Sequence, residues 1–310
     1  MNKKNRIFLS KIQGTFGAKE VNLTAENNAL EVTDDSEIKI IDEIEQNLEI
    51  CDGEFGQEAP AVGPSRVEIV LKAPVRSFGV TEPDWITRLE AAGMEIDDSV
   101  GFKATPTDIS SDAYTKDDTV WEHIRGNTKT GILRKTSNVV YNFKIETDIN
   151  KVPYITFEGK GVDDGEEDVD LETALTLSNA ERYACMPSEK IVLGQTSFKL
   201  RKWAFDAGIV VSQEEGETNG YGVSKIDDRI SKFTCTVESN VNPRDYLNSD
   251  GAISIIWGPT GKKIQFYATV AKVLSCNRSY EGNRMTYDVE LSVLNNDFFI
   301  WVNAAVGISS

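Results

Sequence analysis

Histidine is the side chain that most often serves as an acid, a base or a metal ligand, and this sequence holds a single one, His123. A transition-metal site needs further ligands, and the sequence has neither a second histidine nor a Cys-x-x-Cys pair. A Ser-His-Asp triad would have to use the same histidine, and no Gly-x-Ser-x-Gly turn frames a serine. We therefore interpret His123 as a packed or surface residue.

The cysteines are the next candidates for chemistry, and they lie far apart at positions 51, 185, 235 and 276. Cys235 alternates with Phe233 and Val237, which is the position of a small core hydrophobe in a strand. This spacing predicts four reduced thiols in a protein made in the cytosol, rather than a disulfide framework.

Glycine-rich and acid-rich segments give weaker indications of a site. Residues 258–263, Gly-Pro-Thr-Gly-Lys-Lys, lack the spacing of a phosphate-binding loop and the Ser or Thr after its lysine. Residues 163–172 are mostly acidic but lack the ligand spacing and flanking helices of a calcium loop. A carboxylate pair for glycoside hydrolysis stays open, because any two of the 50 acidic residues can meet in space. No catalytic residue, metal or cofactor is predicted.

The length and the charge limit the class of protein. A chain of 310 residues suits one large or two medium domains. Its net charge of −17 opposes a grip on DNA, because affinity for nucleic acid depends on cations that displace counterions. The charge fits either simple solubility or a surface that lies near DNA without binding it. No apolar run approaches the roughly 20 residues that span a bilayer, so we expect no membrane insertion.

A long antiparallel hairpin at residues 263–295 is the element that organises the rest of the sequence. Its second arm alternates apolar and polar residues, the period of a strand with one buried and one solvated face. Its first arm begins at Ile264 and loses the alternation near Ala271, as at a β-bulge, and Gly282 lies in the turn-rich segment between the arms. The second arm sets Met285, Tyr287, Val289, Leu291 and Val293 against Thr286, Asp288, Glu290 and Ser292.

A similar hairpin is predicted at residues 138–162, with the same alternation in both arms. A strand at 66–72 and a short helix at 81–93 precede it. A strand at 232–238 and a short proline-containing helix at 242–247 precede the later hairpin. The order of strand, short helix and long hairpin therefore occurs twice, which predicts a duplicated module.

The duplication predicts a mainly β protein, built of two tandem β-sandwich or half-barrel modules that each carry a short flanking α-helix. The first module is assigned to residues 61–162 and the second to residues 181–310. Residues 163–180 are interpreted as an acidic linker, because such self-repelling segments rarely fold against a core.

The remaining segments lie outside the repeat. Residues 1–60 form an N-terminal segment with strand pieces at 29–32 and 37–40, while residues 41–48 have the apolar spacing of a helical turn. Residues 101–120 are polar and predict a loop or an insertion.

The residues of both hairpins resemble those of tail tube proteins of long-tailed, siphovirus-type bacteriophages. In the second half the resemblance lies in residues 263–274, 284–293 and the run Asn296-Asp297-Phe298-Phe299-Ile300. In the first half it lies in Glu82-Pro83-Asp84-Trp85 with its Gly93 stop, and in the return strand at 153–159. The similarity covers residues 65–300 in pattern and has no invariant motif.

The resemblance implies a structural subunit and not an enzyme. Members of that family stack as rings whose inner strands form one barrel around a lumen through which the genome passes. The implied partner is the chain itself, as a trimeric ring with pseudo-sixfold symmetry, or as a hexamer if the halves are not true copies. Tail terminator, tape measure and distal tail proteins are further implied partners. The protein would be made in the host bacterial cytoplasm and would be located in the virion tail.

On this interpretation the polar faces of the hairpins would line the lumen. An acidic lumen would repel the phosphate backbone of passing DNA, whereas a basic one would hold it. Simple exposure to solvent explains the polar character of these residues equally well. The acidic region 34–54 would be a loop that reaches the next ring. The candidate lumen-facing residues are Asn142, Lys144, Glu146, Thr156, Glu158, Thr286, Asp288, Glu290 and Ser292.

Two alternatives remain open at this level. One is the inner tube of a contractile tail or a secretion apparatus. The other is a β-sandwich module of a phage tail that binds or hydrolyses cell-envelope carbohydrate, which would need aromatic side chains clustered on an exposed face. The apolar surroundings of Trp85, Trp203, Trp257 and Trp301 favour a core or an interface instead.

Overall fold

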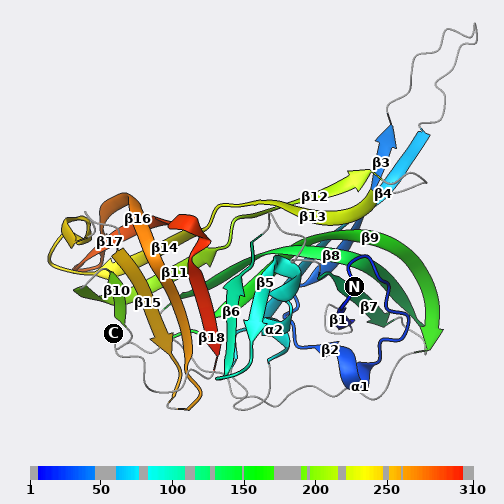
Figure 1. The fold of residues 1–310 in the computed structure, drawn as a ribbon, viewed down its shortest axis with the longest axis horizontal. Helices are drawn as coiled ribbons and strands as arrows, with labels where there is room; N and C mark the ends of the chain where they lie inside the picture. Colours follow the sequence, from blue (N-terminus) through cyan, green and yellow to red (C-terminus); the bar gives the residue numbers. More distant parts are fainter. Residues whose placement is uncertain are drawn as a thin grey trace, which may run out of the picture.

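The fold is mainly β, as the alternating patterns predict, and antiparallel pairing joins most of its strands into one large sheet (Figure 1). A computed structural model describes residues 6–45, 61–76, 83–108, 116–125, 130–148, 150–170, 190–193, 196–215, 221–246, 251–259 and 261–302. None of the helices in these ranges has the length and apolar character needed to cross a membrane.

Six strands of the first half pair in the order β1-β7-β8-β9-β4-β3. A short helix, α1 (Ala25–Asn28), and a short strand, β2 (Ala29–Leu30), lie against β1. The six strands are β1 (Arg6–Ile12), β3 (Glu37–Glu45), β4 (Ala61–Pro74), β7 (Asp118–Arg125), β8 (Thr130–Asp148) and β9 (Tyr154–Asp170).

Six strands of the second half pair in the order β10-β15-β16-β17-β14-β11, and β11 pairs again with β10, so this half closes into a small barrel. A 3-10 turn, η5 (Leu294–Asn296), follows β17 and leads into β18 (Phe298–Val302). Strand β18 pairs with residues 264–268 of β16. The six strands are β10 (Lys190–Leu193), β11 (Thr196–Asp206), β14 (Lys232–Glu238), β15 (Gly251–Trp257), β16 (Ile264–Glu281) and β17 (Arg284–Val293).

The two halves repeat the same pairing pattern, strand for strand. In the first half β3 pairs with β4, β4 with β9, β9 with β8 and β8 with β7; in the second, β11 pairs with β14, β14 with β17, β17 with β16 and β16 with β15. Both copies carry one extra residue on the hairpin arm, opposite Asp118–Val120 in the first and opposite Gly251–Ile253 in the second. The predicted duplication is therefore present in the topology.

The short helices also repeat in position. In the first half α2 (Asp84–Thr87) and the 3-10 helix η2 (Glu90–Ala92) follow β4, and η2 contacts β8. In the second half η4 (Pro243–Tyr246) follows β14 and contacts β16. The helical segment of the first half ends at Gly93, the C-cap of η2, whose φ of +67° is the left-handed conformation that glycine adopts without cost. The second is a 3-10 turn rather than the predicted α-helix.

The halves merge into one sheet because β8 also pairs with β11, from Lys144 opposite Asp206 to Asp148 opposite Lys202. Eight strands then run without a break in the order β3-β4-β9-β8-β11-β14-β17-β16. One face of this sheet is apolar and covers the core, where the rings of Phe205 and Phe266 lie 4.6 Å apart between centroids.

Two hairpins cross from one half to the other. Strands β5 (Met94–Asp97) and β6 (Phe102–Pro106) extend the second half through pairing of β6 with β18. Strands β12 (Ile209–Glu215) and β13 (Tyr221–Arg229) lie across β8 and β9 of the first half (Figure 1). At the end of β13 the buried Arg229 donates to the carbonyls of Ala92 and Gly93 at 3.0 and 2.7 Å, where a cation complements the end of a helix.

The expectation that residues 163–180 form a linker is wrong for the part that the structure describes. Residues 163–170 are the end of β9 and pair with residues 130–136 of β8. The acidic run is tolerated in a strand because basic side chains neutralise it: Arg134 pairs with Glu166, and Lys135 lies 2.6 Å from Glu167. Residues 171–180 lie outside the described residues.

Other local predictions need smaller corrections. Residues 41–45 belong to β3 and not to a helical turn, because each pairs in register with β4 or lies at its bulge. The supposed insertion at 101–120 contains β6 and the start of β7, and its residues 109–115 are not described. The turn of the second hairpin is tighter than predicted, because Glu281 and Arg284 still pair and only Gly282 and Asn283 separate the arms.

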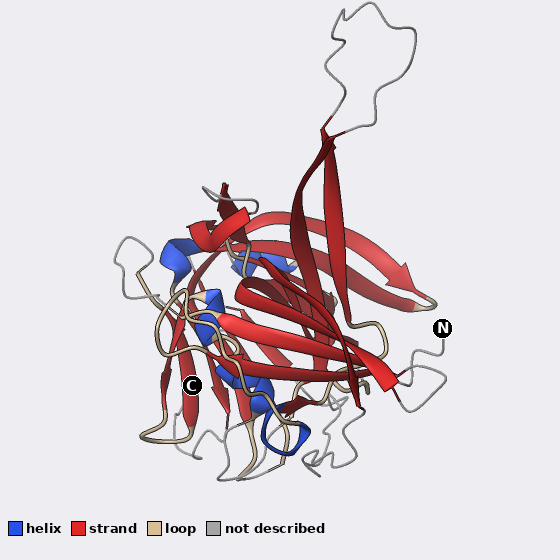
Figure 2. Cartoon of the chain, turned by 90° about the vertical axis from the view of Figure 1, so that its right-hand side faces the viewer, coloured by secondary structure: helices blue, strands red, loops and turns tan. Residues whose placement is uncertain are grey.

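The paired ends of β3 and β4 project away from the rest of the molecule (Figure 2). They lie at one end of the molecule, whereas β16 and β17 lie at the opposite end (Figure 1). Within the predicted loop over residues 34–54, Glu37–Glu45 form β3, and residues 46–54 are not described.

Candidate functional site

The polar face of the eight-stranded sheet is the candidate functional surface, because it is continuous across both halves. All nine predicted lumen-facing residues lie on this face by strand alternation, and eight of them are at least partly exposed. Thr286 is the exception, since its exposed fraction is 0%. We attribute this burial to its position opposite Glu238, whose carboxylate holds Lys199 and Arg284 at 3.2 and 3.6 Å.

In the first half, the predicted residues form a cluster around Lys144. Its Nζ lies 3.0 Å from Glu158 and 3.7 Å from Asp206, and the Asn142 amide donates to Asp206 at 3.1 Å. Burial lowers the pKa of Lys144, but the hydrogen bond from its ammonium to Glu158 and the charge of Asp206 outweigh this and raise the pKa overall. Lys144 is thus a neutralised cation. Sequence patterns do not reveal Asp206, because its cross-strand partner Lys144 is 62 residues away in the sequence.

In the second half, Asp288 and Glu290 border an open depression of about 280 Å³. Thr236 donates its hydroxyl to Asp288 at 2.6 Å, and Ser275 lies 3.4 Å from Glu290. The depression holds both acids and a base but no enclosed volume, so a substrate there would stay in contact with solvent. Its lining residues are Lys202, Thr234, Cys235, Thr236, Ser275, Asn277, Asp288, Val289 and Glu290.

The charges on this face are mixed and not predominantly acidic. Like charges directly opposite each other destabilise a sheet, so paired strands tend to set acids against bases. The acidic surplus lies elsewhere, for example at residues 163–170 of β9. The acidic side chains of the face are Glu37, Glu68, Glu146, Asp148, Glu158, Asp206, Glu238, Glu281, Asp288 and Glu290; the basic ones are Lys39, Arg66, Lys72, Lys144, Lys160, Lys199, Arg201, Lys202, Lys232, Lys272 and Arg284.

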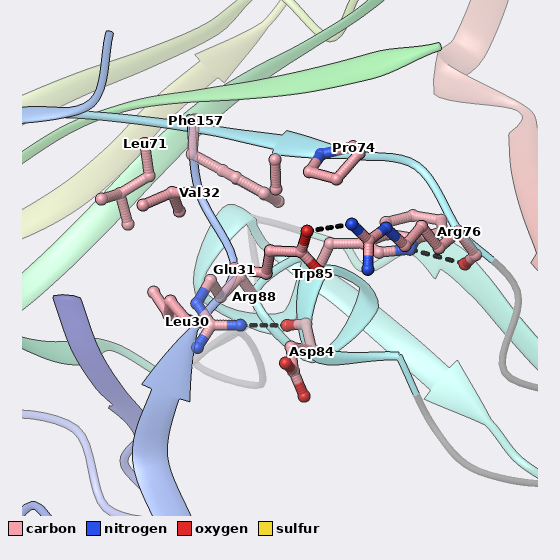
Figure 3. A pocket seen from close by; sticks show the side chains of 11 residues that line it. Leu30, Glu31, Val32, Leu71, Pro74, Arg76, Asp84, Trp85, Arg88 and Phe157 are labelled. Atoms are coloured by element: carbon pink, nitrogen blue, oxygen red, sulfur yellow. Dashed lines mark hydrogen bonds and ion pairs between the residues drawn. The ribbon is translucent and has the colours of Figure 1, made fainter. Parts of the chain in front are cut away.

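A small cavity lies between β4 and α2 in the first half (Figure 3). Its volume of about 20 Å³ has room for roughly one water molecule. The Trp85 indole donates to the carbonyl of Arg76 at 2.8 Å, and Arg76 pairs with Glu31 at its edge (Figure 3). Burial raises the pKa of Asp84 on its wall, but a site of this size cannot take a substrate.

A buried polar cluster joins β1, β7, β8 and α2. The Ser10 hydroxyl lies 2.7 Å from each carboxylate oxygen of Asp118, the Tyr141 hydroxyl donates to the same carboxylate at 2.9 Å, and Arg88 lies 3.7 Å away. Burial raises the pKa of Asp118 in spite of the Arg88 charge. Both oxygens already accept hydrogen bonds inside the fold, so this carboxylate ties strands together and has no position to act on a ligand.

The histidine and the cysteines take structural positions. His123 lies in β7 between Ile7 and Leu133 and is 6% exposed, so it is packed. Cys235 and Cys276 are free thiols, as predicted, and burial raises the pKa of Cys235, which makes it a poor nucleophile. Cys51 and Cys185 lie outside the described residues. No three His, Cys, Asp or Glu side chains within the described ranges come together as metal ligands would.

The four tryptophans considered above lie where the apolar pattern predicted. Trp85, Trp203 and Trp257 are buried in the core, and Trp301 is 9% exposed. They form no exposed stacking platform of the kind that carbohydrate binding requires.

Comparison with known proteins adds no assignment: no protein-family model matches the chain, and no curated protein matches it. The arrangement itself offers a broad polar face, two repeated halves and a set of small or open cavities.

Proposed function

We propose that this chain is a structural subunit of a phage tail tube, which assembles with copies of itself into stacked rings. The observation that carries the proposal is the single eight-stranded sheet made from two repeats of one strand order, which has, among the described residues, an unpaired stretch of strand at each end. The polar face of that sheet would line the lumen through which the viral genome passes into the host.

The free edges support assembly because an unpaired strand edge is a template for pairing with another chain. Among the strands that the structure describes, β3 pairs only with β4, and residues 272–281 of β16 pair only with β17. All neighbours in the sheet are antiparallel, so β3 and β16 run in opposite directions. The last strand of one copy can therefore pair antiparallel with the first strand of the next.

Contacts of this head-to-tail kind form a ring when the rotation closes. Each chain carries two modules, so three copies would supply six modules in a trimeric ring with pseudo-sixfold symmetry; a hexamer of chains is the alternative closure. The projecting ends of β3 and β4 would reach the neighbouring ring (Figure 2). In a virion tail the ends of the tube would meet tail terminator and distal tail proteins, and the lumen would first hold a tape measure protein.

The charge of the face bears on passage of DNA. Lysines such as Lys144 are held by neighbouring carboxylates and have little charge left to bind phosphates. A lumen of balanced charge would let DNA pass without binding it. We therefore propose a lumen of balanced charge in place of the acidic lumen that the sequence suggests. The same architecture would serve the inner tube of a contractile tail or a secretion apparatus.

Electron microscopy of the purified chain tests the proposal. At rising protein concentration we expect stacked rings or hollow tubes in negative stain, with a matching shift to large species in sedimentation velocity. A protein that stays monomeric at the highest soluble concentration would contradict the proposal.

A further inference from the structure

We propose that neighbouring copies join by antiparallel pairing of β3 with the end of β16, with Lys39 of one copy opposite Glu281 of the next and Ile40 opposite Tyr280. This inference rests on the ring assembly proposed above and adds to it the strands and the register of the contact. The partner is a second copy of this chain.

The chain contains a template for this contact, namely the pairing of β8 with β11 that joins its own two halves. There Ile145 lies opposite Phe205 and Glu146 lies opposite Ala204. Both Ile145 and Phe205 are 0% exposed. In the repeated topology β16 is the counterpart of β8, and β3 is the counterpart of β11. A ring built from equal steps would therefore repeat the β8–β11 contact between β16 of one copy and β3 of the next.

The register follows from the cross-strand partners in each half. On the side of β3, Ile40 lies opposite Val67, and Phe205 of β11 lies opposite Phe233. With strand 66–72 aligned on strand 232–238, Val67 is the counterpart of Phe233 and Ile40 is therefore the counterpart of Phe205. This match aligns the buried residues Val67, Ile69 and Leu71 of β4 with Phe233, Cys235 and Val237 of β14.

The same alignment fixes the counterpart of β8. In the first half Leu71 lies opposite Phe157, which in turn lies opposite Phe143 of β8. Ile145 follows two residues later on the same face of β8.

In the second half Val237 lies opposite Tyr287, which lies opposite Arg278 of β16. Arg278 therefore corresponds to Phe143, and Tyr280, two residues later, corresponds to Ile145. Because Ile145 faces Phe205 inside the chain, Tyr280 of one copy would face Ile40 of the next.

The exposure of these two residues supports the pairing. Tyr280 is 66% exposed and Ile40 is only half-buried, although their counterparts within the chain are fully buried. Strand edges that face solvent are usually protected by charges, and a large aromatic residue at such an edge marks a place of contact.

The charges select the same register. Lys39 lies opposite Glu68 within its own sheet, and Glu281 lies opposite Arg284. Pairing Lys39 with Glu281 continues the alternation of sign across the junction, which stabilises a sheet. A slip of two residues would set Glu37 against Glu281, two like charges. A slip of four residues would set Lys39 against Asn277 and leave Tyr280 beyond the start of β3.

Cysteine cross-linking tests the register directly. In a background with Cys51, Cys185 and Cys276 replaced by serine, the chain carrying both Lys39→Cys and Glu281→Cys should oxidise to covalent oligomers. Directly opposite residues bring their Cβ atoms within about 5.5 Å, close to the distance that a disulfide needs. A residue two positions further along the strand is already about 7–8 Å away, and Asn277 is four positions from Glu281. The matched control carries Lys39→Cys with Asn277→Cys and should stay uncross-linked on a denaturing gel.

Charge reversal gives a second measurement on the same pair. Lys39→Glu should raise the protein concentration at which rings form by about tenfold, because it sets like charges at every junction. Adding Glu281→Lys should restore assembly, whereas Lys19→Glu, at an exposed lysine outside β3 and β16, should leave it unchanged. Glu281 also bonds to Arg201 within the chain, so the informative comparison is the double variant against Lys39→Glu.

The two proposals fail in different ways. If the unaltered chain forms rings but the 39–281 pair does not cross-link, or the 39–277 pair does so instead, the register is wrong and the tube proposal stands. If the unaltered chain never assembles, the tube proposal itself fails.

Discussion

Single buried polar residues join neighbouring strands of this fold. Asp118 shows this most clearly, because Ser10 of β1 and Tyr141 of β8 both reach its carboxylate on β7. A buried carboxylate costs free energy unless its oxygens are hydrogen-bonded, so each of these bonds matters to stability. The neighbouring Asp117 is also fully buried, and the backbone amide of Gly17 donates to it at 3.3 Å.

Replacing Tyr141 by phenylalanine tests the network around Asp118. The change removes one hydrogen bond to a buried carboxylate and leaves the ring in place, so we expect a loss of about 2 kcal/mol in the free energy of unfolding. Tyr267→Phe is the control, since the Tyr267 ring stacks on Phe299 and its hydroxyl bonds to no residue within the described ranges. Urea titration followed by tryptophan fluorescence would measure both, and equal midpoints would contradict the role given to Tyr141.

Asp117 predicts a particular pH dependence of stability. Burial raises its pKa to about 7, so the folded protein keeps this proton up to that pH, whereas the unfolded chain releases it near the usual value of 3.8. The stabilising contribution of the protonated group is therefore fully present below about pH 4 and is lost as the pH rises to about 7. Relative to the native chain, Asp117→Asn should gain stability over that interval. Melting temperatures of both proteins at pH 4.5 and 7.5 would show it, and a constant difference would count against it.

At the scale of elements, the sheet is held in place by tight corners as much as by its strands. Gly208 lies at the corner where β11 leaves β8 and β12 begins, with a φ of +63°. A Cβ atom there would lie 1.9 Å from the carbonyl oxygen of Ile230. The corner directs the β12–β13 hairpin onto the first half of the molecule.

Gly208→Ala should therefore destabilise the fold strongly, by more than about 3 kcal/mol, because the clash is with backbone that cannot move aside. Gly261→Ala is the matched control: it also has a positive φ, +81°, but a Cβ atom there meets nothing within 4 Å. It should cost only about 1 kcal/mol. Thermal unfolding of the two variants compares them, and similar losses would show that the corner is less constrained than the contact implies.

Elements whose signal is local could be predicted from the sequence, and elements that depend on distant partners could not. The hairpins of β8–β9 and β16–β17 were found because the alternation of residues such as Tyr287 and Asp288 lies within one strand. The acidic end of β9 was misread because Arg134 and Lys135, which neutralise it, lie on another strand. The barrel closure through β10 was missed because four residues of strand carry almost no periodicity.

The site shows the same limit. Strand alternation placed all nine candidate residues on one face of the sheet, since a period of two fixes the face of every residue in a strand. It could not show that Thr286 is covered, or that Asp206 and Lys232 join the same face from strands remote in sequence. The balance of charge on the face depends on these additions.

At the scale of the whole molecule, the second half closes into its own barrel through the pairing of β10 with β11, and the two halves share a sheet through the pairing of β8 with β11. The contact that joins the halves uses one edge of β8 and one edge of β11. The corresponding edges of β16 and β3 are free among the described strands and lie at opposite ends of the chain (Figure 1). Unpaired strand edges of this kind are templates for pairing with another chain.

The symmetry of the assembled ring tests the proposed assembly most directly. Class averages of end-on views by cryo-electron microscopy should show six lobes around a central hole, with threefold symmetry because the lobes alternate between the two halves of the chain. A closed particle with six whole chains would contradict the trimer, and an absence of any ring with a central hole would contradict the account as a whole.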